Sequence, residues 1–234
     1  MENELRTIRT QLRLAMNGVI ATSMREKGMK YKLNFGVPVP EIREIAKLHT
    51  PDAGLAAALW KEDIREFKIL ATLLQPAEVF SAEQAQQWVR EIPYPEIAEQ
   101  ASRNLFSRMP EAEALVERLL SGEPGRYARM VAFLVGARLL SGGDAFPISQ
   151  KQGDGSSTAE DRPDFLRECI RSLEDVSVSW QEKQAALLAL KFYGRQSSGQ
   201  VDEILHLVSR WAASDEAVLQ EFYNDLKFEF EYYR

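Results

Sequence analysis

Apolar residues recur at intervals of three and four along most of this chain, and this spacing constrains the fold more than any other feature. In residues 5–16, for example, Leu5, Ile8 and Leu12 fall on one side of a helix. Segments of about 10 to 15 residues with the same spacing follow one another to the end of the chain. No run combines strict alternation with β-branched residues, so the sequence predicts helices and no strand.

The predicted helices come in pairs joined by short turns, which favours a repeat architecture. The pairs recur every 35 to 45 residues, near the roughly 40-residue period of HEAT and armadillo arrays. Small residues such as Ala56–Ala58 and Ala185–Ala186 allow neighbouring helices to approach closely. We therefore expect an all-α fold, an α-α superhelix or HEAT/armadillo-like solenoid of stacked antiparallel helix pairs. A compact helical bundle is the alternative.

Two stretches interrupt the helical pattern. Pro38 and Pro40 are expected to delay the next helix until Glu41, because proline lacks a backbone donor and restricts the residue before it. Residues 141–162 are rich in Gly, Ser and polar residues with little apolar pattern, which is typical of a flexible surface insertion. We expect a single helical-repeat domain over residues 1–234 with this insertion inside it.

Charge and composition exclude several classes of protein. The formal net charge is −6, so attraction of the whole chain to DNA or to an anionic membrane is unfavourable, and any nucleic-acid site must be a local basic patch. No apolar run is long enough to span a bilayer, and no leader-like start is present, so we expect a cytoplasmic protein. One cysteine, Cys169, and two histidines predict neither a disulfide nor a zinc site. We expect Cys169 to pack inside a helix, and we expect no metal or cofactor.

Three segments in the first third of the chain carry a family resemblance. Residues 35–47 contain a Gly-Val-Pro-Val-Pro turn that leads into a helix, Leu59–Trp60 follow, and Arg65-Glu66-Phe67 opens a further helix in residues 65–71. Together they resemble the AlkD-like DNA alkylation repair family. The matching motifs cover about residues 30 to 75, and the order of helices is compatible over the rest of the chain.

The resemblance implies a DNA glycosylase that holds duplex DNA in the concave groove of a HEAT-like solenoid. Members release purines alkylated at N3 or N7 without a metal or a diffusible cofactor. Because the alkylated base is already cationic, the enzyme mainly stabilises positive charge that develops on the sugar, and a carboxylate near the ribose suits that task. Aromatic side chains pack against the lesion nucleotide.

This chain departs from the family pattern where the chemistry is expected. Active members carry a Trp followed four residues later by an Asp, and the corresponding positions here are Tyr94 and Ala98. Glu96 or Glu99 would have to replace the missing carboxylate. A second family tryptophan would fall near Leu187 and is also absent, whereas Arg129 matches a family arginine of the groove.

Each candidate site also has a plainer interpretation. Glu96 and Glu99 lie one helical turn apart, where like charges raise each other's pKa, but acidic residues also favour a helix start in general. Basic residues at helical spacing predict a phosphate-binding face or a salt-bridged surface. The predicted nucleic-acid contacts are Tyr94, Arg43, Lys47, Arg129, Lys191 and Arg195.

We expect the four tryptophans, Trp60, Trp88, Trp180 and Trp211, to lie in the core.

Two functions follow from the sequence. The first is a DNA-repair protein that binds duplex DNA in a concave groove and removes alkylated purines weakly or not at all, because the expected aspartate is absent. The second is a non-catalytic HEAT-type scaffold that binds a protein or peptide partner, which the acidic balance favours.

Overall fold

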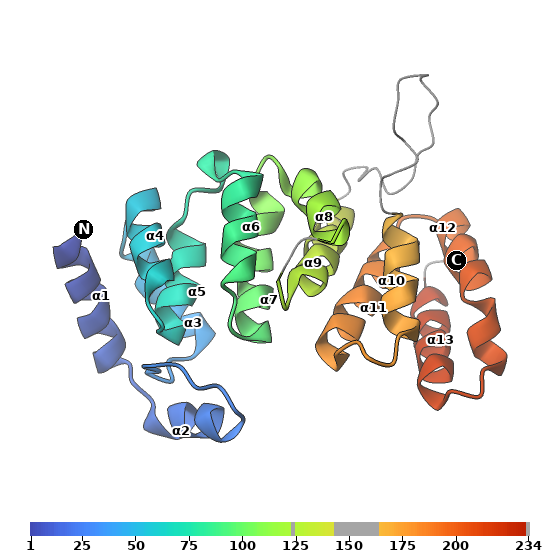
Figure 1. Cartoon of the computed structure of the whole chain (residues 1–234), viewed down its shortest axis with the longest axis horizontal. Helices are drawn as coiled ribbons and strands as arrows, with labels where there is room; N and C mark the ends of the chain where they lie inside the picture. The colour runs from blue at the N-terminus through green and yellow to red at the C-terminus, as the bar shows by residue number, and fades with distance from the viewer. Residues whose placement is uncertain (123–124, 143–163, 233–234) are drawn as a thin grey trace. The chain divides into compact units, whose positions relative to one another are not determined.

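The computed structural model describes residues 1–122, 125–142 and 164–232, and over these ranges the chain is built from helices (Figure 1). Within the described ranges no strand occurs; the nearest feature is an isolated parallel bridge between Leu33 and Ile64. None of the helices described is both long and apolar enough to cross a membrane. The absence of strands in these ranges agrees with the expected all-α class.

The described helices belong to two compact units, which interleave in sequence. Unit 1 comprises residues 1–81 and 92–110, and unit 2 comprises residues 82–91 and 111–234. Whether they act as the single domain expected from the sequence stays a prediction. The insertion expected at 141–162 lies outside the described residues except for Ser141 and Gly142.

Unit 1 is a set of helices packed around α5. Helix α5 packs against α3, α4 and α7, and α1 packs against α3 and α4. The elements of unit 1 are α1 (Glu2–Leu14), α2 (Gly18–Glu26), α3 (Val39–Lys47), α4 (Ala53–Lys61), α5 (Arg65–Leu74), η1 (Ala77–Val79), α7 (Pro95–Asn104) and η2 (Phe106–Arg108).

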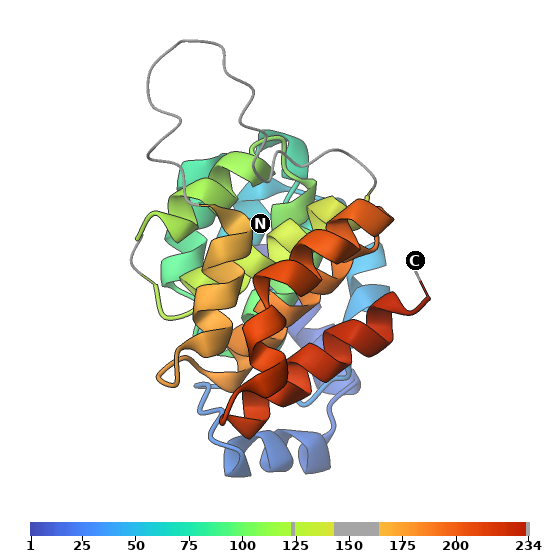
Figure 2. The same ribbon diagram turned by 90° about the vertical axis from the view of Figure 1, so that its right-hand side faces the viewer.

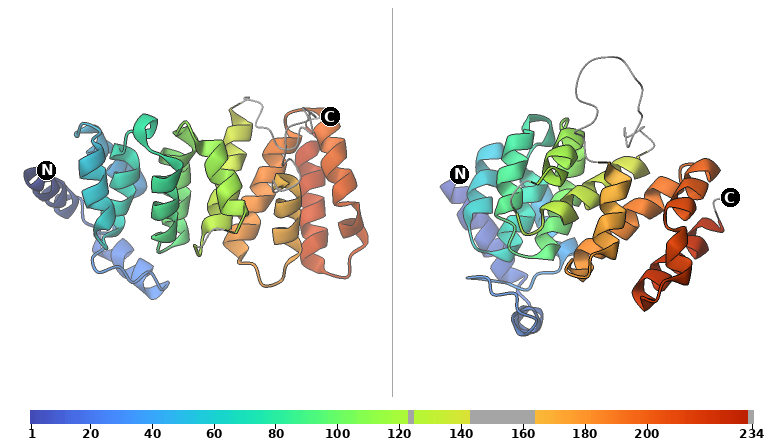
Figure 3. Two further views of the ribbon diagram at one scale, coloured as in Figure 1. Left: turned by 45° about the horizontal axis from the view of Figure 1, so that its top comes forward. Right: turned by 45° about the vertical axis from the view of Figure 1, so that its right-hand side comes forward.

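Unit 2 is organised around α9 and α11, which pack on each other. Helix α8 pairs with α9, α10 pairs with α11, and α12 pairs with α13 (Figure 3). Figure 2 shows α12 and α13 as neighbouring helices at the end of the chain. The elements of unit 2 are α6 (Ala82–Arg90), α8 (Ala112–Leu120), α9 (Ala128–Ser141), α10 (Phe165–Glu174), α11 (Trp180–Gly194), α12 (Ser198–Leu207), η3 (Ser209–Ala213) and α13 (Ala217–Phe230).

Polar side chains at several helix starts explain where those helices begin. The carboxylate of Asp52 accepts the amide of Leu55 at the start of α4, and Ser179 accepts the amide of Glu182 at the start of α11. Helix α3 begins at Val39, two residues before the expected Glu41. Proline is tolerated in the first turn of a helix, where its missing N–H would have no partner, so Pro40 does not delay the helix.

Helix α2 was not predicted from the sequence. Asn17 caps it by accepting the amides of Val19 and Ile20 through its side chain. Only Ala21 is buried in this helix, so it offers almost no apolar pattern to detect. The helix matters because the chain that leaves it carries a cluster of basic residues.

Most of the expected core positions are buried. Trp60, Trp88 and Trp211 are buried, and Cys169 packs inside α10, as predicted. Trp180 contradicts the prediction, because it is 53% exposed at the first position of α11. Its ring stacks on Phe222 of α13 with centroids 5.8 Å apart, so one face of the indole is covered.

Candidate nucleic-acid interface

The start of α7 brings three of the predicted site residues together. Tyr94 is the N-cap of this helix, Pro95 occupies its first turn, and Glu96 and Glu99 follow one turn apart. Helix α7 packs against α5 within unit 1. The surroundings of Glu96 and Glu99 therefore depend on what α5 presents to them.

Glu96 is held in an ion pair with a buried arginine of α5. Arg65 donates from Nε to one carboxylate oxygen of Glu96 at 2.8 Å and from Nη2 to the other at 2.5 Å. The Arg65 side chain is only 2% exposed. A two-point contact of this kind is the strongest geometry available to arginine and carboxylate. Glu96 therefore serves to balance a buried charge.

A second carboxylate on α5 anchors the loop that precedes α3. Glu66 is fully buried and accepts the backbone amides of Phe35, Gly36 and Val37 at 3.1, 3.0 and 3.2 Å. Arg65 also donates to Glu66 and to the carbonyl of Val37. The charged pair of α5 thus fixes both the loop before α3 and the start of α7.

Two tyrosines meet beside this cluster. The rings of Tyr31 and Tyr94 pack edge to face with centroids 4.8 Å apart. The Tyr94 hydroxyl accepts the backbone amide of Lys30 at 2.7 Å. The Tyr31 hydroxyl is buried and has no hydrogen-bond partner in the described part of the chain. Burial, with a further contribution from the charge of Glu96, raises the pKa of Tyr31 far above its ordinary value.

The chain from the last turn of α2 toward α3 is strongly basic next to these tyrosines. Arg25, Lys27, Lys30 and Lys32 are all exposed, with Glu26 as the single acidic residue among them. None of the four basic side chains forms an ion pair with a carboxylate of the described ranges. We call residues 25–32 the basic segment. The sequence reasoning missed it, although Lys27, Lys30 and Lys32 lie close together in the sequence.

Glu99 differs from Glu96 in that it lies exposed on α7. Partial burial of its carboxyl raises its pKa above the ordinary value, the charge of Glu96 adds to the rise, and Arg103 opposes it. Within this turn of α7, Glu99 is therefore the carboxylate available to solvent and to a ligand.

The predicted basic contacts on α3 lie in two different settings. Lys47 forms an exposed ion pair with Glu44 at 2.7 Å. Arg43 forms no ion pair in the described structure, and its Nε is buried without a partner. Of the two, Arg43 is the one whose charge is not balanced by a neighbour.

The three predicted basic contacts in unit 2 all have acidic partners. Arg129 contacts Glu168 at 2.8 Å and Glu182 at 3.1 Å, and so ties α9 to α10 and α11. Lys191 and Arg195 of α11 are paired with carboxylates of α13. These pairs are Lys191 with Asp225 at 2.7 Å and Arg195 with Glu229 at 2.6 Å. Each of these residues holds helices together, which leaves less of its charge for a phosphate.

The two positions at which the sequence predicted a departure from the family pattern, Ala98 and Leu187, are both buried. Ala98 is 0% exposed on α7, and Leu187 is 3% exposed on α11. The residue after it, Leu188, is 37% exposed and faces solvent. Trp180 lies eight residues before Leu188, about two turns along α11, and is the exposed tryptophan of that helix.

Comparison with known proteins decides the family. The family model described as DNA alkylation repair enzyme matches residues 8–141, which is more than half of the 234-residue chain. The chain belongs to the DNA alkylation repair enzyme family. No curated protein matches it in sequence.

A solved structure supports the fold of this family member. It is described as belonging to a new family of proteins related to the HEAT-like repeat DNA glycosylases with affinity for branched DNA structures. The match has a TM-score of 0.65 and covers 87% of this chain and 81% of that chain, at 12% sequence identity. The predicted HEAT-like stack of helix pairs is therefore confirmed.

Charge is divided unequally between the two units of this family member. Unit 1 has 14 Lys and Arg against 12 Asp and Glu, and unit 2 has 15 against 23. The formal charges are thus +2 and −8, which add to the −6 of the whole chain. The acidic balance that argued against DNA belongs to unit 2 alone.

Proposed function

We propose that this chain binds duplex DNA through the face of unit 1 formed by the basic segment and Tyr94, and that its release of alkylated bases is weak or absent. Membership of the DNA alkylation repair enzyme family supports the DNA ligand. The positive charge of unit 1 supports the choice of this unit, because phosphate binding depends on unpaired Lys and Arg.

One observation carries the proposal. The hydrogen bond from the Lys30 amide to the Tyr94 hydroxyl joins the basic segment to Tyr94, the aromatic residue that we align with the family's tryptophan. Phosphate contacts fix the register of a nucleic acid, and an aromatic ring packs against a base. The two kinds of contact are therefore adjacent here.

The proposed loss of catalysis rests on the carboxylates near Tyr94. We align the buried Ala98 with the family's aspartate, and Glu96 is paired with Arg65. Only Glu99 remains in this turn to stabilise a positive sugar. Loss of one preorganised electrostatic group costs an enzyme on the order of a hundred- to a thousand-fold in rate.

DNA binding is tested by removing charge from the basic segment. We expect Lys27→Ala/Lys30→Ala/Lys32→Ala to weaken binding of a labelled duplex and to lower the salt dependence by about 0.9 for each phosphate that these lysines neutralise. The Lys30 amide still reaches Tyr94 in this variant, so the local fold is kept. The matched control is Arg6→Ala/Arg13→Ala/Lys61→Ala, which removes the same charge from exposed positions of unit 1. Equally weakened binding in both variants would disprove the proposed face.

Catalysis is tested by base release from methylated duplex DNA. We expect little or no release by the wild type, and any activity present should be lost in Glu99→Gln and retained, per folded molecule, in Glu96→Gln. Robust release that survives both substitutions would show that the active site lies elsewhere.

A second candidate is a scaffold that binds a protein or peptide, and the charge of unit 2 favours it. Its excess of carboxylates, 23 against 15 basic residues, suits a basic partner better than DNA. Undetectable DNA binding at low salt, together with binding of a basic peptide, would favour this function over the first.

A further inference from the structure

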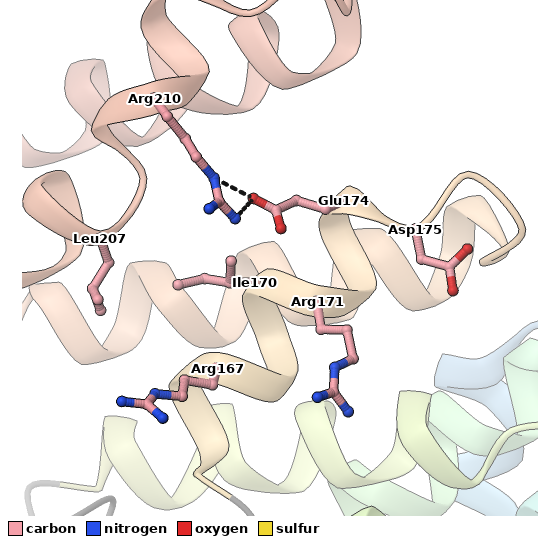
Figure 4. A pocket seen from close by; sticks show the side chains of 7 residues that line it. All are labelled: Arg167, Ile170, Arg171, Glu174, Asp175, Leu207 and Arg210. Atoms are coloured by element: carbon pink, nitrogen blue, oxygen red, sulfur yellow. Dashed lines mark hydrogen bonds and ion pairs between the residues drawn. The ribbon is translucent and has the colours of Figure 1, made fainter.

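Unit 2 contains a pocket whose seven lining residues include three arginines. It has a volume of about 510 Å³ and is formed by α10 and by the chain from the end of α12 into η3. Figure 4 shows Arg167 and Arg171 on one side of α10, with Arg210 across from them. The other lining residues are Ile170, Glu174, Asp175 and Leu207.

The two arginines of α10 keep most of their donors available. They are four residues apart and so lie on the same face, with side chains 80% and 74% exposed. Arg167 contacts Asp164 at 3.2 Å through Nε, and Arg171 contacts Glu168 at 3.1 Å through Nη1. Among the described residues neither guanidinium has another hydrogen-bond partner. Two forks of N–H groups thus face solvent.

The carboxylates that hold these arginines are shared with other donors. Asp164 also caps α10 by accepting the amides of Leu166 and Arg167. Glu168 also accepts a hydrogen bond from Arg129 at 2.8 Å. Because each carboxylate also accepts hydrogen bonds from other donors, it neutralises the charge of the exposed arginine only in part.

Arg210 is oriented by a carboxylate of the pocket. One oxygen of Glu174 accepts hydrogen bonds from Nε and Nη2 of Arg210 and from the indole of Trp211. Burial alone would raise the pKa of Glu174, but these hydrogen bonds outweigh it and lower the pKa, so the carboxylate stays ionised. Glu174 therefore fixes Arg210 at the edge of the pocket.

The remaining lining gives the pocket a mixed character. Asp175 follows the end of α10, and its carboxylate is engaged with the amide and hydroxyl of Ser177. Ile170 and Leu207 supply apolar surface next to the guanidinium groups, as Figure 4 shows. Planar N–H forks suit phosphate oxygens, and apolar surface suits the sugar that a backbone phosphate carries.

We propose that this pocket is a second phosphate-binding site, which takes a backbone phosphate of a nucleic-acid strand. It goes beyond the interface of unit 1 and rests on the proposal that the chain binds nucleic acid. Arg167 and Arg171 contact the phosphate, and Arg210 of η3 lines the other side of the site.

The first experiment measures binding of a labelled duplex to the full chain over a range of salt. Arg167→Ala/Arg171→Ala should weaken binding several-fold at low salt and reduce the salt dependence by up to about 0.9, because the two arginines contact one phosphate. The control Arg126→Ala/Lys227→Ala removes two exposed charges of unit 2 outside the pocket. Identical affinity and salt dependence in the two variants would overturn the proposal.

The outcome separates this inference from the proposed function. If the basic-segment variant binds DNA less tightly and Arg167→Ala/Arg171→Ala binds it as the wild type does, the unit 1 interface is supported and the second site is disproved. If the wild type binds no DNA at low salt, both fall.

A second experiment identifies the ligand by the NMR signals of the arginine Nε–H groups. The signals of Arg167, Arg171 and Arg210 should move when duplex DNA is added, and a substitution of each assigns them. Movement with inorganic phosphate but not with DNA would show a small-anion site and contradict the proposal. Movement with an acidic peptide but not with DNA would show a protein-binding site instead, which also contradicts it.

Discussion

The guanidinium of Arg65 and the carboxylate of Glu96 form a two-point ion pair between α5 and α7, at 2.8 Å and 2.5 Å. Arg65 is buried, and its other donors go to Glu66 and to the carbonyl of Val37. Burial alone would lower the pKa of Arg65, but the bonds and charges of the two glutamates outweigh it and raise the pKa. The pair is thus a structural element that joins α5 to α7 in unit 1.

Glu96→Ala should therefore destabilise the protein, whatever its effect on DNA. Removing the carboxylate leaves two donors of a buried arginine without their partner, although Glu66 still balances its charge. We expect a decrease of about 1 to 3 kcal/mol in the free energy of unfolding, measured by urea denaturation. The matched control is Glu99→Ala, an exposed carboxylate one turn away, for which the change should stay within about 0.5 kcal/mol. Equal effects would contradict a structural role for Glu96.

The loop before α3 provides a second prediction, at Gly36. This residue has φ +71°, and a Cβ there would lie 2.2 Å from the carbonyl oxygen of Asn17 and 2.7 Å from the amide of Ala21. Since both atoms are backbone, Gly36→Ala should cost about 2 to 4 kcal/mol by thermal or urea unfolding.

Gly28→Ala separates the two causes of that cost. Gly28 also has a positive φ, +90°, but a Cβ there would meet nothing within 4 Å. Its substitution should cost about 1 to 2 kcal/mol from backbone strain alone. A cost for Gly36→Ala no larger than that for Gly28→Ala would show that the loop adjusts to the added methyl group.

The sequence was sufficient to predict the fold because helix formation here follows local patterns. Apolar spacing and capping residues such as Asp52 mark the helices that pack on a core. The start of α3 was misplaced because Pro40 is compatible with a first turn. Helix α2 was missed because it buries only Ala21 and so has no apolar stripe.

The candidate site was less predictable, because its character depends on contacts distant in sequence. Nothing near Glu96 in the sequence shows that Arg65, 31 positions earlier, neutralises it. The family register drew attention to Tyr94 but not to the basic segment, which a backbone amide of Lys30 joins to it. The net charge of the whole chain likewise did not show that unit 1 is positive, because the acidic excess of unit 2 outweighs it.

Tyr31→Phe should test whether the buried hydroxyl has a function. That hydroxyl has no hydrogen-bond partner among the described residues, so its removal should leave stability unchanged or raise it by up to about 1 kcal/mol. Tyr94→Phe is the matched control, because its hydroxyl accepts the Lys30 amide and its removal should cost about 0.5 to 1.5 kcal/mol. If Tyr31→Phe is stable yet binds DNA less tightly, the hydroxyl contacts the ligand. A destabilisation as large as that of Tyr94→Phe would show that the Tyr31 hydroxyl has a stabilising partner in solution.

Ala98→Asp is the substitution that the family pattern suggests for restoring catalysis, but burial predicts a different outcome. Ala98 is 0% exposed on α7, which packs against α5. A carboxylate there would be desolvated where α7 packs on α5. We expect a decrease of about 2 kcal/mol or more in the free energy of unfolding and no gain of base release. Wild-type stability combined with increased release would show that this position opens toward the ligand.

Glu99 gives a prediction about pH. Its pKa is raised in the folded protein by burial and by the charge of Glu96, against the effect of Arg103. The folded state therefore holds a proton on Glu99 at pH values where the unfolded chain has released it. The contribution of Glu99 to the free energy of unfolding is present at low pH and is lost as the pH rises through the pKa of the folded state. DNA phosphates near Glu99 would raise the pKa further, so binding should take up a proton.

We therefore expect the affinity of the wild type for duplex DNA to increase, relative to Glu99→Gln, as the pH falls from about 8 to about 5. Glutamine keeps the shape of the side chain and removes its charge, so the difference between the two proteins isolates Glu99 from the other carboxylates. The measurement is fluorescence anisotropy at constant salt, since the phosphate contacts respond to ionic strength. If the two proteins show the same pH dependence, Glu99 does not face the bound DNA, and the carboxylate proposed for residual catalysis lies elsewhere.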